Sequence, residues 1–307
     1  MLRSVRRDSC HRTKHEGRPG RACCPFRVRR ASSTPSTLLS RTVSADDPPP
    51  TQLQSVLDDI PVAAIKTGML SNASVVRTVA RALLAQRRAP HHHLPIVIDP
   101  VCVSTSGHTL LEHDAIAALV DELLPLAAVL TPNIDEAILL LQYLKPQHQE
   151  PARSVSSIND MLRTACDLRC ALGDGAVLLK GGHLPRGSVC LADVVSASVE
   201  SAASAAVRIR GVECEGMVLR PGVDAEILLH AARVSPRASS PALVDGPVVV
   251  DILCEQEEGV DVCTLFVRPY LDSNSTHGTG CTLSAALTCA LARGEPRACS
   301  ALSFLWY

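Results

Sequence analysis

From about residue 52 onward, short apolar runs alternate with longer segments in which apolar residues recur every three or four positions. The short runs end at glycine, proline or polar residues, which is typical of buried strands, and the periodic segments are typical of helices that cover a sheet. This pattern predicts strands at residues 60–67, 94–98, 127–130 and 176–179. It predicts helices at residues 112–124, 134–144 and 158–172, and one that Ser71 or Asn72 caps and that ends near residue 86.

Strands that alternate with helices of this length predict an α/β fold, in which helices cover both faces of a parallel sheet. Ligands of such folds bind beyond the carboxyl ends of the strands. Polar or glycine-rich segments follow the predicted strands, at residues 66–69, 99–100, 131–133 and 180–183. We therefore expect these segments to open on one rim of the sheet and to hold the functional site.

The alternation breaks off at residues 185–247, which are rich in Ala, Ser, Val and Arg and contain Pro221, Pro236 and Pro241 without a clear period. We interpret this stretch as an insertion that is disordered in part, and we expect regular structure to resume just after Pro247. The pattern then predicts a pair of strands at residues 248–253 and 262–267, joined by an acidic turn at residues 255–259.

The N-terminal segment differs from the rest of the chain in charge. Residues 1–45 hold ten Arg and one Lys against Asp8 and Glu16, a local charge of +9, and the whole chain has a net charge of −1. This basic, Ser- and Pro-rich stretch is typical of a disordered tail, and also of a mitochondrial transit peptide. Nucleic-acid binding by the tail ranks third, because charge alone reads no sequence. We therefore divide the chain into a basic tail with a linker at residues 1–50 and a folded domain at residues 51–307.

The composition argues against several classes of protein. Hydrophobic residues make up 46% and charged residues 20% of the chain, as in soluble globular proteins, and no uncharged apolar run reaches the roughly 18 residues of a membrane span. Aromatic residues make up only 2%, which leaves few side chains on which nucleic-acid bases could stack. The 13 cysteines are scattered along a long chain, so we interpret them as reduced thiols. We predict a cytoplasmic protein with no membrane or nucleic-acid partner, and mitochondrial targeting stays open.

The strongest chemical signal is the segment Gly278, Thr279, Gly280 and Cys281, which leads into a predicted helix at residues 282–293. Glycines at a helix start let backbone N–H groups close around an anion, and the helix dipole adds positive charge there. The same field would lower the pKa of the Cys281 thiol. A glycine loop that serves tight packing, with Cys281 as a small apolar residue, explains this spacing about equally well.

Residues 276–284 (THGTGCTLS) resemble the signature of hydroxymethylpyrimidine/phosphomethylpyrimidine kinases, thiamine-pathway members of the ribokinase-like superfamily. Further matching segments follow the family's order along the chain, at residues 66–70, 99–101, 131–137 and 179–183. The resemblance covers roughly residues 54–184 and 248–293. It implies a three-layer α/β/α sandwich around a mostly parallel central sheet.

The resemblance implies roles for the residues at the predicted helix start. Cys281 corresponds to the base that takes the proton of the substrate hydroxyl; most of the superfamily has Asp there, and Cys marks the pyrimidine-kinase branch. Gly278, Thr279 and Gly280 correspond to the anion hole for the γ-phosphoryl group. Thr276 would also contact the nucleotide.

The resemblance also implies roles along the rim. Asn133 and Glu136 match an Asn-x-x-Glu pattern that helps hold Mg²⁺, largely through water. Lys180 matches a lysine near the nucleotide phosphates, Asp99 would act through metal-bound water, and Met69 would line the pyrimidine pocket. Taken singly, each has a structural interpretation: Asn133 as a helix cap, Glu136 as a first-turn acid, Lys180 as a solvated charge and Met69 as core.

Two departures from the family pattern qualify the functional prediction. The family opens with a strand, a glycine-rich segment that closes over the pyrimidine and a strand that supplies a Glu, but residues 1–50 match none of them. Its last helices are missing too, since Arg293 is followed by only 14 residues. We expect a sandwich that is incomplete at both ends.

The predicted function is phosphorylation of 4-amino-5-hydroxymethyl-2-methylpyrimidine and its monophosphate, with ATP and Mg²⁺ as cofactors. An inactive or truncated remnant that retains a nucleotide half-site, and a pyridoxal-kinase-like enzyme, stay open as alternatives, as does a homodimer.

Overall fold

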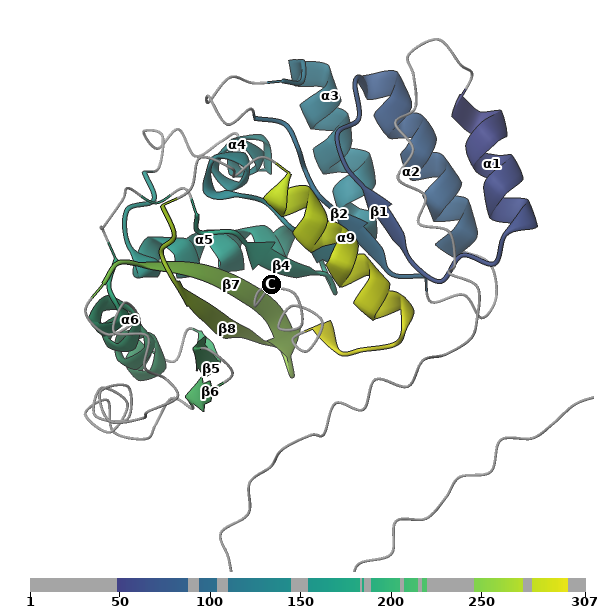
Figure 1. Cartoon of the computed structure of the whole chain (residues 1–307). Helices are drawn as coiled ribbons and strands as arrows, with labels where there is room; N and C mark the ends of the chain where they lie inside the picture. The colour runs from purple at the N-terminus through teal and green to yellow at the C-terminus, as the bar shows by residue number, and fades with distance from the viewer. Residues whose placement is uncertain are drawn as a thin grey trace, which may run out of the picture. The chain divides into compact units, whose positions relative to one another are not determined.

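The computed structural model (Figure 1) describes residues 49–87, 94–103, 110–144, 154–182, 184, 189–204, 207–214, 217–219, 246–272 and 278–297. The chain divides into residues 1–37 and 38–307, and every described residue belongs to the second unit. The predicted basic tail therefore lies outside the described residues.

One sheet with the strand order β1-β2-β3-β4-β7-β8-β5-β6 organises the described part of the chain. Its first four strands pair in parallel, as predicted, and are short: β1 (Ile65–Thr67), β2 (Ile96–Ile98), β3 (Val129–Leu130) and β4 (Ala176–Leu179). The run at residues 60–67 thus forms a strand only at its end. Because the four strands are parallel, their carboxyl ends meet at one edge.

The other half of the sheet is built on a hairpin. The strands β7 (Val248–Glu257) and β8 (Val260–Pro269) pair antiparallel, which confirms the predicted strand pair and lengthens both members. Glu258 and Gly259 make the turn, with φ of 52° and 81°. Two consecutive left-handed residues suit a tight hairpin, because their twist matches that of the strands. The strand β7 also pairs antiparallel with β4, so the sheet is mixed.

One prediction for residues 185–247 is wrong, because regular structure is present before Pro247. It contains α6 (Leu191–Ser204), β5 (Arg208–Cys214) and β6 (Met217–Leu219), and β5 pairs in parallel with β8. The small residues of α6 give a weak periodic signal, although Val194 and Ala197 are buried.

Helices cover one face of the sheet closely. They are α2 (Ala73–Arg87), α3 (His113–Ala118), α4 (Ile134–Leu144), α5 (Ile158–Ala171) and α6, and α1 (Pro49–Asp59) packs on α2. The predicted helix at residues 112–124 is only partly α-helical: π-helical and 3-10 turns follow at Leu119–Leu123 and Leu124–Leu126. Pro125 lies at the start of the 3-10 turn, where its missing N–H donor leaves no helical hydrogen bond unmade.

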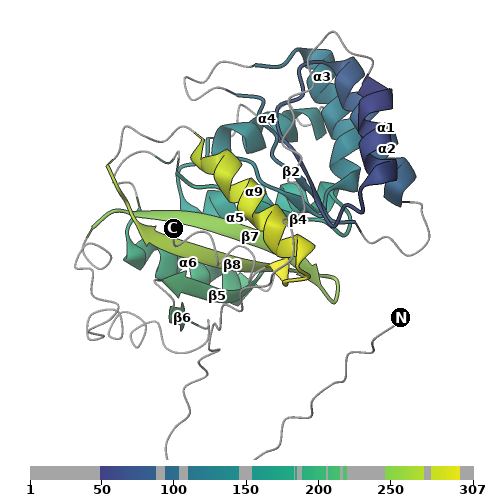
Figure 2. The same ribbon diagram turned by 45° about the vertical axis from the view of Figure 1, so that its right-hand side comes forward.

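Alternate strand residues divide the core between the two faces. Ile96, Ile98, Val177 and Leu179 belong to the larger apolar cluster under the helices named above. Residues of the opposite parity, such as Val97 and Leu178, belong to a smaller cluster that contains Leu287 of α9 (Thr279–Ala292). Figures 1 and 2 show α9, in yellow, crossing this second face. The predicted three layers are confirmed, and α9 forms the second outer layer of the described part.

Candidate active site

Asp99 lies at the centre of a polar cluster beyond the carboxyl ends of the parallel strands. It follows β2, and only 1% of the residue is exposed. The Nζ atom of Lys180, just after β4, lies 3.2 Å from one carboxylate oxygen, and the Nζ atom of Lys66 in β1 lies 3.5 Å from the other. The strands β1 and β4, which are separated by β2 and β3, therefore each bring an ammonium group to one buried carboxylate.

Two hydroxyl groups complete this cluster. Ser284 of α9 donates to Asp99 at 2.9 Å, and Thr131, just after β3, donates to it at 3.3 Å. We call Asp99, Lys66, Lys180, Ser284 and Thr131 the Asp99 cluster. Burial raises the pKa of Asp99, but the charges of Lys180 and Lys66 and the hydrogen bond from Ser284 outweigh burial and hold the pKa below its ordinary value. Asp99 is therefore an ionised structural centre and a poor proton acceptor.

The N-terminus of α9 lies against the same cluster. Lys66 donates from Nζ to the Cys281 carbonyl at 3.1 Å, and a Cβ atom on Gly280 would lie 2.9 Å from the Nζ atom of Lys180. Gly278 is the N-cap residue and has φ of 80°, which favours glycine. As in the first turn of any helix, the N–H groups of Gly280 and Cys281 have no acceptor inside the helix. The structure thus brings the predicted anion-binding segment next to two lysines.

The predicted shift of the Cys281 pKa is wrong. The thiol is exposed at the rim. Even so, desolvation against the cluster and the negative charge of Asp99 raise its pKa above the ordinary value, and Lys66 and Lys180 offset this only in part. The sequence showed the helix start, but it did not show that a buried carboxylate lies beside the thiol.

Asn133 and Glu136 interlock at the start of α4. The Asn133 side chain accepts from the N–H of Glu136, and the Glu136 carboxylate accepts from the N–H of Asn133, both at 2.8 Å. This reciprocal pair is the helix cap that Asn133 suggested on its own. It also fixes Glu136, which is 3% exposed, beside the Asp99 cluster. Burial raises the pKa of Glu136 to about 7, although Lys180 and the Asn133 N–H act against this rise.

A third buried carboxylate, Asp251 of β7, orders the segment after Lys180. It accepts from the N–H of Gly181 at 2.9 Å and forms an ion pair with Arg268 of β8. Gly181 approaches β7 so closely that a Cβ atom there would lie 1.9 Å from the Val250 carbonyl oxygen. Asp251 and Gly181 together hold the end of β4 against β7, and this fixes the backbone position of Lys180.

The structure gathers most of the predicted site residues. Asp99, Lys180, Gly280 and Cys281 share contacts or direct electrostatic interactions, and Asn133 bridges to Lys180 across the ends of β3 and β4. The Met69 prediction stays open: the residue is 50% exposed, so it is not core. Thr276 lies outside the described residues.

Lys66, Ser284 and Asp251 are residues of this region to which the sequence reasoning assigned no role. Two of them left a signal, because Lys66 and Asp251 are charged residues inside otherwise apolar runs that form strands. A charge at such a position needs a partner, which marks it as a candidate for a buried polar cluster. Ser284 left none, since serine is unremarkable in a helix.

Known proteins resemble this chain in sequence and in fold. The sequence model of the family described as "Phosphomethylpyrimidine kinase" matches residues 48–217 and 233–301. A hydroxymethylpyrimidine/phosphomethylpyrimidine kinase of Rhizobium meliloti is 31% identical over 247 residues, which are 80% of this chain and 62% of that protein. The thiamine biosynthesis bifunctional protein ThiED of Geobacter sulfurreducens is 30% identical over 245 residues, 80% of this chain and 34% of that protein. The chain thus spans less than two thirds of either relative.

Among solved structures, an ADP complex of Bacillus subtilis pyridoxal kinase matches the fold with a TM-score of 0.51. The match covers 83% of this chain and 65% of that one at 21% identity, so it supports the ribokinase-like fold alone. Within the residues that the structure describes, no helix has the length and apolar character that crossing a membrane requires.

Proposed function

The chain belongs to the phosphomethylpyrimidine kinase family, and from this premise we propose that it transfers the γ-phosphoryl group of ATP to 4-amino-5-hydroxymethyl-2-methylpyrimidine and to its monophosphate in thiamine biosynthesis. One observation carries the proposal: the glycine-rich start of α9 lies directly against Lys66, Lys180 and Asp99. Backbone donors and ammonium groups that point to one place suit the negative charge of a phosphoryl group in transfer.

The charge balance of the site supports an anionic ligand. Two lysines face the single carboxylate of Asp99, and the pKa of Glu136 at about 7 keeps much of that carboxyl neutral near neutral pH. The site then has an excess of positive charge, which attracts phosphate. In this proposal Lys180 contacts the nucleotide phosphates, and the N–H groups of Gly278 to Cys281 surround the γ-phosphoryl group. Asp99 holds the two lysines in place.

Cys281 is the proposed base. Its thiolate takes the proton of the substrate hydroxyl as that oxygen forms a bond to the γ-phosphorus, and the bond to the ADP oxygen breaks. The raised pKa of Cys281 in the unliganded chain means that little thiolate is present near neutral pH. Activity should therefore increase with pH up to values above the ordinary thiol pKa.

The donor set also fits Mg²⁺, which prefers oxygen ligands and is typically bound by one or two carboxylates together with substrate phosphates. Glu136 is a buried carboxylate whose pKa is raised by burial despite Lys180 and the Asn133 N–H, and a divalent cation would stabilise its charged form. Bound there, the ion would neutralise phosphate charge. In this proposal Glu136 holds the ion through water, with Asp99 nearby, and Asn133 orients Glu136 through the cap.

The test of the catalytic role is Cys281→Ala beside Cys281→Ser, in a coupled assay for ADP with the pyrimidine as acceptor. We expect Cys281→Ala to lower kcat by about 10²–10⁴-fold, the usual worth of a general base, with little change in the KM for ATP. The alkaline rise of kcat with pH should disappear with the thiol. A matched control is Cys289→Ser, farther along the same helix. If kcat keeps its size and its pH profile in Cys281→Ala, Cys281 is not the base.

A nucleotide-binding half-site is the second candidate function. Among the described residues, those proposed to bind the phosphates form a connected cluster. Met69, which is proposed to contact the pyrimidine, is exposed instead. Calorimetry with ATP and the coupled assay, both on the 307-residue chain, separate the two candidates. ATP binding without pyrimidine turnover supports the half-site, and turnover rejects it.

Proposals also remain for the organisation and location of the chain. We propose a tail and linker at residues 1–50 and a kinase domain at residues 51–307 with an insertion at about 185–247. The start of the family match at residue 48 fits the boundary between linker and domain, whereas within residues 185–247 the match leaves out only residues 218–232. We propose a cytoplasmic location, with mitochondrial targeting by the basic N-terminus as the alternative. Gel filtration would decide between a monomer and a homodimer.

A further inference from the structure

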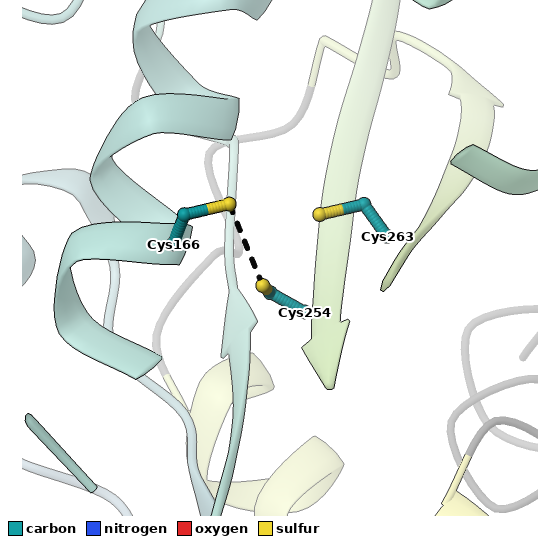
Figure 3. A group of neighbouring side chains, drawn as sticks. All are labelled: Cys166, Cys254 and Cys263. Atoms are coloured by element: carbon teal, nitrogen blue, oxygen red, sulfur yellow. Dashed lines mark hydrogen bonds between the residues drawn. The ribbon is translucent and has the colours of Figure 1, made fainter. Parts of the chain in front are cut away.

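Three cysteine thiols converge where α5 packs on the β7–β8 hairpin. Cys166 belongs to α5, Cys254 to β7 and Cys263 to β8, and their sulfur atoms all lie within 4.8 Å of one another. Figure 3 shows the three sulfur atoms turned toward a common point. We call these residues the thiol cluster.

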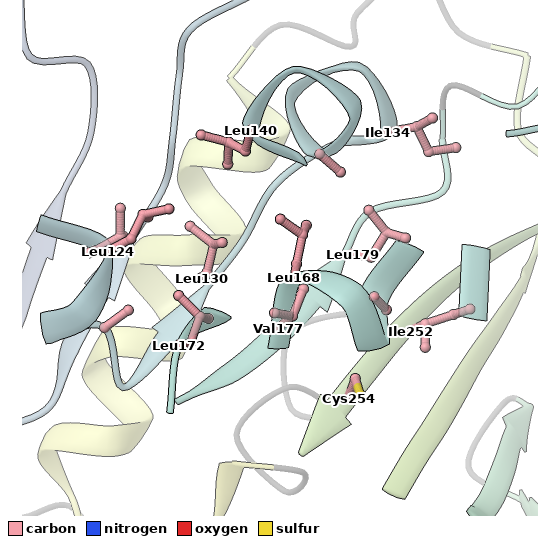
Figure 4. Close-up of a cluster of buried hydrophobic side chains, with 14 of the residues drawn as sticks. Leu124, Leu130, Ile134, Leu140, Leu168, Leu172, Val177, Leu179, Ile252 and Cys254 are labelled. Carbon is pink, nitrogen blue, oxygen red and sulfur yellow. The ribbon is translucent and has the colours of Figure 1, made fainter. Parts of the chain in front are cut away.

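The thiol cluster is separate from the Asp99 cluster. Cys254 pairs with Val177, three residues before Lys180, which is roughly 10 Å along the strand. Cys254 and Cys263 are cross-strand partners and are 0% exposed, whereas Cys166 is partly exposed. Figure 4 shows Cys254 beside the apolar core, near Ile252 and the end of β7. The cluster therefore has two buried members and one member that gives access from the surface.

The distances suit a shared ion better than a disulfide. The Sγ atoms of Cys166 and Cys254 are 3.6 Å apart, whereas a disulfide bond is about 2.05 Å long and would leave the third thiol without a role. A metal–sulfur bond of about 2.3 Å in a planar three-coordinate site places the sulfur atoms about 4 Å from one another. The thiol cluster thus already has nearly the size of a trigonal sulfur site.

The surroundings of the cluster favour an ion bound by sulfur alone. The neighbouring carboxylate, Asp261 of β8, forms an ion pair with Arg169, one turn after Cys166 on α5. Structural zinc almost always takes four ligands, whereas thiolates without such a fourth ligand suit Cu(I).

We propose that Cys166, Cys254 and Cys263 form a binding site for one soft monovalent metal ion of the Cu(I) type. Each thiol that is still protonated releases its proton to solvent as its metal–sulfur bond forms, and no electron is transferred, because the ion enters as Cu(I). The bound ion joins α5 to the hairpin. Both elements adjoin β4, so the ion would stabilise the strand that ends at Lys180.

The test titrates the reduced 307-residue chain with Cu(I) under anaerobic conditions, against a chromophoric Cu(I) chelator. The chain has 13 cysteines, so matched variants are needed. Cys166→Ser removes one ligand, and Cys170→Ser removes an exposed thiol on the same helix that lies outside the cluster. We expect the wild type and Cys170→Ser to bind one tight equivalent that raises the unfolding temperature, and Cys166→Ser to lose both effects. X-ray absorption of the wild-type complex should show three sulfur neighbours and no oxygen.

Three results would overturn the proposal. One is equal Cu(I) affinity of Cys166→Ser and the wild type. Another is a copper shell with fewer than three sulfurs, a measurement that needs no variant to fold. The third is Zn²⁺ binding as tight as that of Cu(I) and lost in Asp261→Asn, which would show a four-ligand site with oxygen.

Discussion

The Asp99 cluster and the thiol cluster lie toward opposite ends of β4. Both contain buried reactive groups, but these groups are stabilised in different ways. In the Asp99 cluster, the protein itself compensates the negative charge of the buried carboxylate, because two ammonium groups and two hydroxyl groups surround it. In the thiol cluster, Cys254 and Cys263 are buried among apolar residues and can remain neutral. The stability of the Asp99 cluster depends on each of its charged and hydroxyl partners. The thiol cluster packs as part of the apolar core when no ion is bound.

The largest expected difference is between Asp99→Asn and Cys254→Ala. Asp99→Asn leaves Lys66 and Lys180 facing each other without a counter-charge and should lower the free energy of unfolding by about 3–5 kcal/mol. Cys254→Ala removes one buried sulfur atom and should cost about 1 kcal/mol in the metal-free chain. Urea unfolding of both variants at neutral pH measures the difference. Similar losses would show that the ion pairs between Asp99 and the two lysines are not what stabilises the Asp99 cluster.

A smaller effect is expected where β4 leads into the Asp99 cluster. Gly181→Ala places a methyl group 1.9 Å from the Val250 carbonyl oxygen, so β7 must move, at a cost of about 1–3 kcal/mol. Gly182→Ala is the matched control, because a Cβ atom there meets nothing within 4 Å. Thermal unfolding of the two variants tests whether the close approach of β4 and β7 is needed. Equal melting temperatures would mean that the strands separate without cost.

The smallest expected effect concerns Glu136, and here the substitution should stabilise the folded chain, whereas the substitutions above destabilise it. Its pKa is about 7 in the folded chain against an ordinary 4.5, so between these values the folded chain holds a proton that the unfolded chain releases. Stability should therefore fall as the pH rises through this window and stay lower above it. Without Mg²⁺, Glu136→Gln should stabilise the chain at pH 8 by about 1–2 kcal/mol and have little effect at pH 4.

Denaturant unfolding of wild type and Glu136→Gln at both pH values checks this prediction. Gln keeps an oxygen that can accept from the N–H of Asn133, so the helix cap survives. A Glu136→Gln variant that is less stable than the wild type at pH 8 would show that the carboxylate is already compensated.

The sequence was most informative where local signals agree with the fold. The helix at residues 134–144 was predicted with the bounds of α4, because Asn133 caps it and its apolar residues recur at helical spacing. The strand at residues 176–179 was predicted equally well, since a fully buried strand is a continuous apolar run. Likewise, the parallel order placed Asp99, Thr131 and Lys180 on one rim, which the structure confirms.

What the sequence could not show depends on contacts between distant segments. The pKa of Cys281 is raised by desolvation against the Asp99 cluster and by the charge of Asp99, 182 positions away. The thiol cluster left no signal, because Cys166, Cys254 and Cys263 each occupy an apolar position of their own element. Only the packing of α5 on the hairpin brings them together.

The position of α9 links ligand binding to the integrity of the core. Its first turn carries Gly280 and Cys281, and its later turns carry Leu287, which is packed with Val97 and Leu178 of the sheet. A local unfolding event that separates α9 from the sheet would therefore disrupt the candidate site and expose one face of the sheet to water at the same time. Any anion that binds at the first turn must suppress this opening in proportion to its affinity. Hydrogen exchange of amides in the middle of β2 and β4 should then become slower when such an anion binds, although the anion does not contact these residues.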